Sequence, residues 1–184
     1  IQTDVMKQQL ICTFLGENRT GLLCQLSKAV NEAGCNILDS RQANFGTDFA
    51  LTMIIEGLHP EITKAELLLP TLSSELELLS LLKRTKAHAK QNIEHLLSLE
   101  FSGPDTPGLL EKVSVFLSEH SASINALRQK SSSVDNTENV RCKIVVSIPD
   151  DLDVTAFAAT TKTFFDSLCL TCTITDKHHI NWSE

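Results

Sequence analysis

Hydrophobic and polar positions repeat along the chain, and the whole pattern occurs twice. Positions of the first half recur at one constant spacing in the second half: Phe14, Gly16, Gly21, Leu22 and Leu23 as Phe101, Gly103, Gly108, Leu109 and Leu110, and Ile37, Arg41 and Gln42 as Ile124, Arg128 and Gln129. Solenoid repeats are shorter, typically about 20 to 50 residues. The sequence therefore predicts two copies of one small domain, residues 1–88 and 89–184.

Each copy contains segments with the strand period and segments with the helix period. Apolar residues recur at helical spacing in Leu22, Leu23, Leu26, Ala29, Val30 and Ala33, and again in Leu109, Leu110, Val113, Phe116 and Leu117. Strands are predicted at 9–16, 36–46, 47–57 and 75–85 in the first copy, and at 95–103, 123–131, 139–148 and 170–178 in the second.

A second helix is predicted in each copy. In the first copy it begins after Pro60 and is expected to end near Pro70, because a proline disfavours helical geometry in the residue before it. In the second copy acidic residues at 150, 151 and 153 precede an apolar stripe that runs from Val154 to Leu168. Negative charge at that position suits the start of a helix.

The resulting order is strand, helix, strand, strand, helix, strand. It is the order of the ferredoxin-like α+β fold, βαββαβ, in which an antiparallel four-stranded sheet carries both helices on one face. Two such domains in tandem are predicted. The second copy has an additional polar segment at residues 131–139, SSSVDNTEN, which we interpret as a longer hairpin loop that is either a surface insertion or a partner contact.

Composition and charge are those of an ordinary globular protein and argue against two kinds of partner. The chain has 184 residues, 42% of them hydrophobic and 21% charged. It shows neither the roughly 18 consecutive apolar residues of a membrane span nor a leader pattern, so we expect a cytoplasmic protein without a membrane partner. The net charge of -7 opposes direct binding of nucleic acid. The basic cluster KRTKAHAK, with Lys83, Arg84, Lys86 and Lys90, is interpreted as a solvated linker rather than a nucleic-acid or partner patch.

One pair among the six cysteines has metal-like spacing. Cys169 and Cys172 are followed by His178 and His179, which raises a zinc or redox hypothesis. Apolar and threonine residues alternate from 170 to 175, however, which predicts a strand, and residues three apart on a strand face opposite sides. We therefore expect buried thiols, no metal site and no cofactor. No recognisable nucleophile set is present, so no catalytic residue is expected either.

The repeated loop GENRTGLL, residues 16–23, returns as GPDTPGLL, residues 103–110. A phosphate-binding loop would need Lys and Ser or Thr where Leu22 and Leu23 stand, and a nucleophile elbow would need a serine between glycines. Two interpretations remain. The first N–H groups of the helix bind a small carboxylate. Alternatively, the polar residues cap the helices: Asn18 or Thr20 in the first loop, and Asp105 or Thr106 with Pro107 in the second.

These loops, together with GCNILDSRQ at residues 34–42 and the GxDxxGLL form of the second loop, resemble the ACT domain, a family of regulatory modules that bind amino acids. The resemblance implies a ligand held at a contact between two modules, by the loop before the first helix and by the start of the next strand. The candidate ligand-binding residues that it implies are Asn18, Arg19, Thr20, Gly21, Leu22, Asn36 and Ile37 in the first copy, and Asp105, Thr106, Pro107, Gly108, Leu109, Ser123 and Ile124 in the second.

The second copy departs from the pattern of the first. Thr106 stands in place of Arg19, and Ser123 stands in place of Asn36. In the first copy, Thr20 stands where many ACT loops have proline. We therefore expect the two copies to bind unequally.

The two-module organisation resembles a transcriptional repressor of this family. That resemblance implies a non-enzymatic, cytoplasmic regulator that binds an amino acid, glycine in particular, and contacts a transcriptional activator protein on DNA rather than DNA itself. An alternative is an amino-acid-sensing regulatory subunit of a metabolic enzyme, for example of one-carbon metabolism. Exposed sheet edges allow either pairing of the two copies within the chain or a homodimer.

Overall fold

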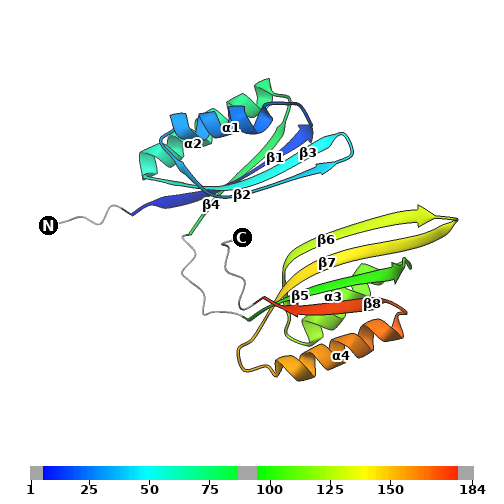
Figure 1. Cartoon of the computed structure of the whole chain (residues 1–184). Coiled ribbons are helices and arrows are strands. Elements are labelled where there is room, and N and C mark those ends of the chain that lie inside the picture. The colour runs from blue at the N-terminus through cyan, green and yellow to red at the C-terminus, as the bar shows by residue number, and fades with distance from the viewer. Residues whose placement is uncertain (1–5, 87–94, 178–184) are drawn as a thin grey trace. The chain divides into compact units, whose positions relative to one another are not determined.

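The chain divides into two compact units, residues 1–89 and 90–184. The computed structural model describes residues 6–86 and 95–177. Each unit is an antiparallel four-stranded sheet with two helices packed on one face (Figure 1). This confirms the predicted α+β class and the ferredoxin-like order in both halves. The predicted boundary between residues 88 and 89 lies outside the described residues.

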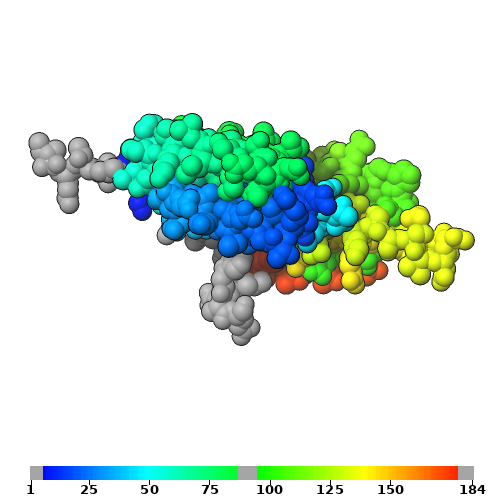
Figure 2. Space-filling view, turned by 90° about the horizontal axis from the view of Figure 1, so that it is seen from above, coloured from blue at the N-terminus to red at the C-terminus, as the bar shows by residue number. Residues whose placement is uncertain are grey.

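The first unit is built from β1 (Gln8–Glu17), α1 (Leu22–Glu32), β2 (Asn36–Phe45), β3 (Asp48–Gly57), α2 (His59–Glu75) and β4 (Leu79–Thr85). The strands lie in the order β2-β3-β1-β4, and β1 runs antiparallel to both of its neighbours. Alternate residues of β1 and β3 face the helices, so that Leu10, Cys12, Phe14 and Met53 are fully buried. α1 and α2 lie side by side over this face and close the core (Figure 2).

The second unit repeats this arrangement with β5 (His95–Pro104), α3 (Leu109–Glu119), β6 (Ser123–Val134), β7 (Thr137–Ile148), α4 (Val154–Ser167) and β8 (Thr171–Asp176). Its strand order is β6-β7-β5-β8. The core includes Phe101 and Phe165, whose ring centroids lie 4.6 Å apart. Asp153 caps α4 by accepting hydrogen bonds from the N–H groups of Thr155 and Ala156. The acidic start that the sequence predicts for this helix is thus confirmed.

α2 does not end near Pro70, as the sequence predicts, but continues to Glu75. Pro70 lies inside the helix and removes one backbone hydrogen bond from it. Leu72 and Leu76 beyond the proline pack against the core, and these apolar contacts offset the lost bond. β4 accordingly begins at Leu79 rather than at residue 75. Even with this extension, no helix in the described part of the chain is long and apolar enough to cross a membrane.

The SSSVDNTEN segment, residues 131–139, is not a longer loop. β6 and β7 continue through it as a paired ladder that ends with Val134 opposite Thr137. Asp135 and Asn136 make the connection, with positive φ angles of 51° and 60°. A two-residue hairpin turn requires such a backbone, and Asn and Asp adopt it more readily than most residues. The extended hairpin projects beyond the rest of the second unit (Figure 1).

Candidate functional site

The loop between β1 and α1 is held at both ends by backbone contacts. The N–H of Asn18 donates to the carbonyl of Thr47 in the β2–β3 turn at 2.9 Å. Gly21 then begins α1 with a φ of 91°, a left-handed conformation that costs glycine little and most other residues more. The loop therefore leaves the strand and enters the helix in a fixed conformation.

Side-chain capping, one of the two interpretations of this loop, is wrong in both units. The residues that cap α1 and α3 are Gly21 and Gly108, and neither helix has a side-chain cap hydrogen bond. Asp105 instead accepts a hydrogen bond from the hydroxyl of Ser131 at 2.7 Å. Because no side chain caps α1, polar groups at the start of this helix are available to a ligand.

Arg19 occupies a different role from the one that its place in the loop suggests. Its Nη2 donates to the carbonyl of Leu76 at the carboxyl end of α2. A helix carries a partial negative charge at that end, so the guanidinium is well placed there. Thr106, the counterpart in the second unit, has no such contact among the described residues. The first loop is thus tied to α2 by a link that the second loop lacks.

A pocket of about 400 Å³ opens at the start of α1. Its lining includes the five predicted loop residues, Asn18, Arg19, Thr20, Gly21 and Leu22, and four that were not predicted, Leu23, Cys24, Gln42 and Phe49. Of these four, Gln42 could have been found from sequence, because it is one of the positions that recur in the second copy, as Gln129. Leu23 recurs too but was assigned to the helix stripe. Its side chain is 43% exposed.

The other predicted residues of the first unit, Asn36 and Ile37, do not join this pocket. Asn36 pairs with Glu56 near the end of β3, whereas Asn18 contacts Thr47 just before β3 begins. These two places are opposite ends of one strand. Within the first unit, therefore, the loop and the start of β2 do not form a single site.

The second unit places its predicted residues in the same way but with different chemistry. Asp105 donates its N–H to the carbonyl of Glu138 at 3.0 Å, and the N–H of Leu109 bonds to the carbonyl of Thr106 at 3.2 Å. Pro107 and Gly108 complete the loop, while Ser123 and Ile124 lie at the far end of β7 from it. The carboxylate of Asp105 stands where the first unit has the neutral Asn18. It would repel an anion at this loop.

The described part of the chain brings no metal-binding cluster together around the cysteines. No group of three or more His, Cys, Asp or Glu residues there is close enough to hold a metal ion, and His178 and His179 lie outside the described residues. Burial raises the pKa of Cys12 to about 12 and that of Cys142 and Cys172 to about 11. These thiols are therefore protonated and unreactive at neutral pH.

Two of the cysteines are exposed, contrary to expectation. Cys24 is exposed on α1 at the pocket, and Cys169 is exposed in the turn before β8. Cys169 has a φ of 58° and lies in the turn before β8, not on the strand. The prediction that Cys169 and Cys172 face opposite sides of one strand therefore does not apply to Cys169. The strand alternation holds only from Thr171 onward.

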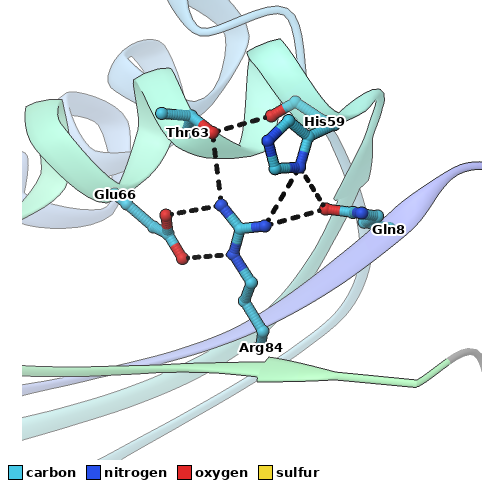
Figure 3. Close-up of polar contacts among 5 residues, drawn as sticks. All are labelled: Gln8, His59, Thr63, Glu66 and Arg84. Atoms are coloured by element: carbon cyan, nitrogen blue, oxygen red, sulfur yellow. Dashed lines mark hydrogen bonds and ion pairs between the residues drawn. The ribbon is translucent and has the colours of Figure 1, made fainter.

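Arg84, from the basic cluster, is not part of a solvated linker. It lies on β4, and its guanidinium forms a fork with the carboxylate of Glu66 on α2, with Nε–Oε1 at 2.7 Å and Nη2–Oε2 at 2.8 Å (Figure 3). Nη1 also donates to the side-chain oxygen of Gln8 at 3.0 Å. The hydrogen bond from Arg84 holds the pKa of Glu66 below its usual value. The guanidinium is therefore engaged within the first unit, and the cluster beyond residue 86 lies outside the described residues.

Comparison with known proteins shows similarity to one family. A sequence model of the ACT domain matches residues 8–82, from the start of β1 into β4. The chain is 29% identical over 160 residues to the glycine cleavage system transcriptional repressor of Escherichia coli (strain K12), covering 87% of this chain and 83% of that protein. It is 32% identical over 69 residues to the UPF0237 protein MJ1558 of Methanocaldococcus jannaschii, covering 38% of this chain and 71% of that protein.

Solved structures extend the likeness over both units. A candidate glycine cleavage system transcriptional repressor matches with a TM-score of 0.73 at 26% identity, over 92% of this chain and 97% of that chain. An unknown protein from Galdieria sulphuraria has the same fold, with a TM-score of 0.73 at 19% identity over 93% of this chain and 99% of that chain. With the family match in the first unit and the same element order in the second, the chain is a tandem ACT-domain protein that resembles the glycine cleavage system transcriptional repressor.

Proposed function

We propose that this protein is a cytoplasmic, non-enzymatic transcriptional regulator that binds an amino acid, glycine in particular, at the loop between β1 and α1. The observation that carries the proposal is the pocket of about 400 Å³ at the start of α1. At this pocket the start of α1 has no side-chain cap. Polar side chains from the loop and from β2 line the same pocket.

The chemistry of this pocket suits a free amino acid. The positive end of α1 and its first N–H groups match the carboxylate of the ligand. The side-chain oxygens of Asn18, Thr20 and Gln42 are acceptors of the kind that an ammonium group needs. The second loop has Asp105 in place of Asn18, so we propose the first unit as the principal binding site.

The regulatory part of the proposal rests on the relatives. The name of the 29% identical protein states both the glycine cleavage system and transcriptional repression. The net charge of -7 opposes direct contact with DNA, so we propose contact with a DNA-bound activator protein instead. Glycine would act by binding unequally to two states of the protein that differ in affinity for the activator.

Calorimetric titration of the chain with glycine and with each other amino acid tests the sensing step. Two matched variants test the charge difference between the loops: one gives the first loop the carboxylate of the second, and the other gives the second loop the amide of the first. Asn18→Asp should weaken binding by about tenfold or more, because it brings a second carboxylate to the anion site. Asp105→Asn in the second loop should leave that affinity unchanged. Absence of heat with every amino acid, or equal effects of the two variants, contradicts the proposal.

Cys24 offers an independent probe because it is exposed and lines the pocket. Ligand in the pocket should slow alkylation of Cys24 in the native protein. Cys169 is exposed in the second unit and is the internal reference, whose rate should not change. If glycine binds and slows neither thiol, or both equally, the ligand does not occupy this pocket.

The partner step has a separate test. A mobility-shift assay with the promoter of a glycine cleavage operon is run with the chain alone, with the activator, and with both, each with and without the amino acid. A shift by the chain that requires the activator supports the proposal. A shift by the chain alone that weakens steeply with salt indicates direct DNA binding and contradicts it.

A further inference from the structure

Each sheet has one face that its own helices leave uncovered in the described part of the chain, and we call it the open face (Figure 1). In the second unit the open face holds a hollow of about 600 Å³. Its charged and hydroxyl side chains come from all four strands: Glu100 from β5, Arg128 and Lys130 from β6, Arg141 and Lys143 from β7, and Thr171 and Thr173 from β8. Four of these side chains are basic and one is acidic.

The basic residues of the hollow are arranged at a cost to the sheet. Arg128 on β6 lies directly opposite Lys143 on β7. Two residues along the ladder, Lys130 lies directly opposite Arg141. Like charges that face each other across two strands destabilise the pair. Two adjacent pairs of this kind indicate that the charge serves something other than the stability of the sheet.

Most of this charge is not neutralised within the protein. Lys143 pairs with Glu100, with Nζ and Oε1 3.3 Å apart. Within residues 6–86 and 95–177, Arg128, Lys130 and Arg141 have no ion pair or side-chain hydrogen bond. All three are exposed. Their guanidinium and ammonium donors therefore face the hollow or the solvent without an acceptor.

The first unit lacks this surface although it has the same register. The positions equivalent to Lys130 and Arg141 are Ala43 and Ala50, which also lie opposite each other. The position equivalent to Lys143 is Thr52, and it faces Arg41. Arg41 is neutralised by Asp39 at 3.2 Å. The positive charge is thus a property of the second unit alone and does not follow from the fold.

We propose that the open face of the second unit is a docking site for an acidic segment of a protein partner. Side chains on the sheet recur every second residue along a strand, so an extended segment with alternating carboxylates that runs along β6 meets Arg128 first and then the facing pair of Lys130 and Arg141. Arginine binds carboxylates through two parallel hydrogen bonds. The hydroxyls of Thr171 and Thr173 add neutral donors at the other side of the hollow.

A protein segment fits this face better than a nucleic acid does. Sheets that bind single-stranded nucleic acid stack bases on aromatic side chains. The side chains that alternate onto this face in the four strands include no aromatic residue among the described positions.

This inference rests on the proposed function in one respect, which is that the protein acts through a protein partner. The test needs neither that partner nor an amino acid. A labelled short peptide in which Glu and Ala alternate is titrated with the full chain, and binding is followed by fluorescence anisotropy. The same peptide with Gln in place of Glu, a labelled DNA duplex and a labelled single-stranded oligonucleotide are titrated in parallel.

The chain should bind the Glu peptide, with an affinity that falls as salt is raised, and should bind the Gln peptide at least about tenfold more weakly. The double variant Lys130→Ala with Arg141→Ala should weaken binding by about tenfold or more. Arg41→Ala, the control in the first unit, should leave it unchanged. Glu100→Gln should strengthen it, because it removes the acidic side chain of the hollow.

Three results would overturn the proposal. One is equal binding of the Glu and Gln peptides. Another is Glu-peptide binding that survives the double variant, provided that melting curves show both proteins folded. The third is tighter binding of either nucleic acid than of the Glu peptide, lost in the same double variant, which would assign the face to nucleic acid. Failure here leaves the amino-acid pocket and the activator assay intact, so the two proposals fail separately.

Discussion

The two units have the same strand register and differ at the surfaces that the register leaves free. Buried positions correspond closely, as Phe14 does to Phe101. On the open faces, Ala43 and Ala50 of the first unit correspond to Lys130 and Arg141 of the second. Packing restricts the size and polarity of a buried side chain, whereas an exposed strand position has few such limits. The two copies therefore share a scaffold and differ in the surfaces that they present to solvent.

The largest effect should come from the shared core. Phe101→Ala removes a buried ring that packs on Phe165, and a buried Phe→Ala change typically costs about 3 to 5 kcal/mol. Because each unit has its own core, calorimetry should show the transition of the second unit at lower temperature and the first unchanged. Phe14→Ala should do the reverse. If either variant lowers both transitions equally, the units do not unfold independently.

A smaller effect should separate two equivalent glycines. A Cβ at Gly16 would lie 2.7 Å from Cδ2 of Leu78, and a Cβ at Gly103 would lie 2.8 Å from Cδ2 of Leu170. The crowding is nearly the same, but Gly103 has a φ of 150°, which side chains rarely allow. Alanine should cost about 1 to 3 kcal/mol at Gly16 through overpacking. It should cost more at Gly103 because backbone strain adds to the crowding.

Chemical denaturation of the two alanine variants, followed unit by unit, checks this order. The matched change Gly21→Ala is a useful reference, since a Cβ there meets nothing within 4 Å and only its φ of 91° opposes it. A cost at Gly16 larger than at Gly103 would show that contact with the leucine just before the last strand, and not the backbone conformation, decides the effect.

The fold of both units could be predicted from the sequence wherever burial creates a periodic pattern of apolar residues. The element order, the two helical stripes of α1 and α3 and the acidic start of α4 follow from periodicity and local charge. The predicted end of α2 near Pro70 was wrong because the rule for the residue before a proline is local. Leu72 and Leu76, beyond the proline, are buried only in the folded core, which that rule does not consider. Residues 131–139 misled because serine, asparagine and aspartate suit a turn, and pairing across a ladder leaves no local signal.

The lining of the candidate pocket was predicted in part, for a similar reason. Residues 18–22 are contiguous, so the loop that contains them could be recognised as a unit. Phe49 reaches the pocket from β3 through register that the sequence does not state, whereas Gln42 on β2 is marked in the sequence only by its recurrence as Gln129. Arg19 was assigned to the ligand, but its contact with Leu76 comes from α2, beyond the end that was predicted for that helix.

Relieving one of the two like-charge pairs should stabilise the second unit slightly. Lys130→Ala and Arg141→Ala together give it the alanine pair of the first unit, and cross-strand pairs contribute about 0.2 to 1 kcal/mol. The melting temperature of the second unit should rise, more at low salt than at high salt. The same variant should lose the acidic peptide. A fall in stability would mean that the basic side chains support the sheet, and the argument from their cost would be wrong.

The smallest effect should be a pH dependence confined to the first unit. The hydrogen bond from Arg84 lowers the pKa of Glu66 in the folded protein, so the ion pair contributes stability above the unfolded pKa of about 4.3 and loses it as the pH falls through the lower folded value. At the equivalent ends of β5 and β8, the second unit has His95 and Asp176, with Nε2–Oδ2 at 2.8 Å, in place of Gln8 and Arg84.

Glu66→Gln should therefore lower the melting temperature of the first unit at pH 6, and the difference from the wild-type chain should shrink as the pH falls below the unfolded glutamate pKa of about 4.3, because the wild-type carboxylate then takes up its proton. Melting curves across this range measure the difference directly, with the second transition as the internal control. Because the fork lies at the protein surface, solvent and salt screen it, and the change at pH 6 should be the smallest of the four. A difference that does not shrink on acidification would mean that the Glu66→Gln substitution disturbs packing rather than removing a charge.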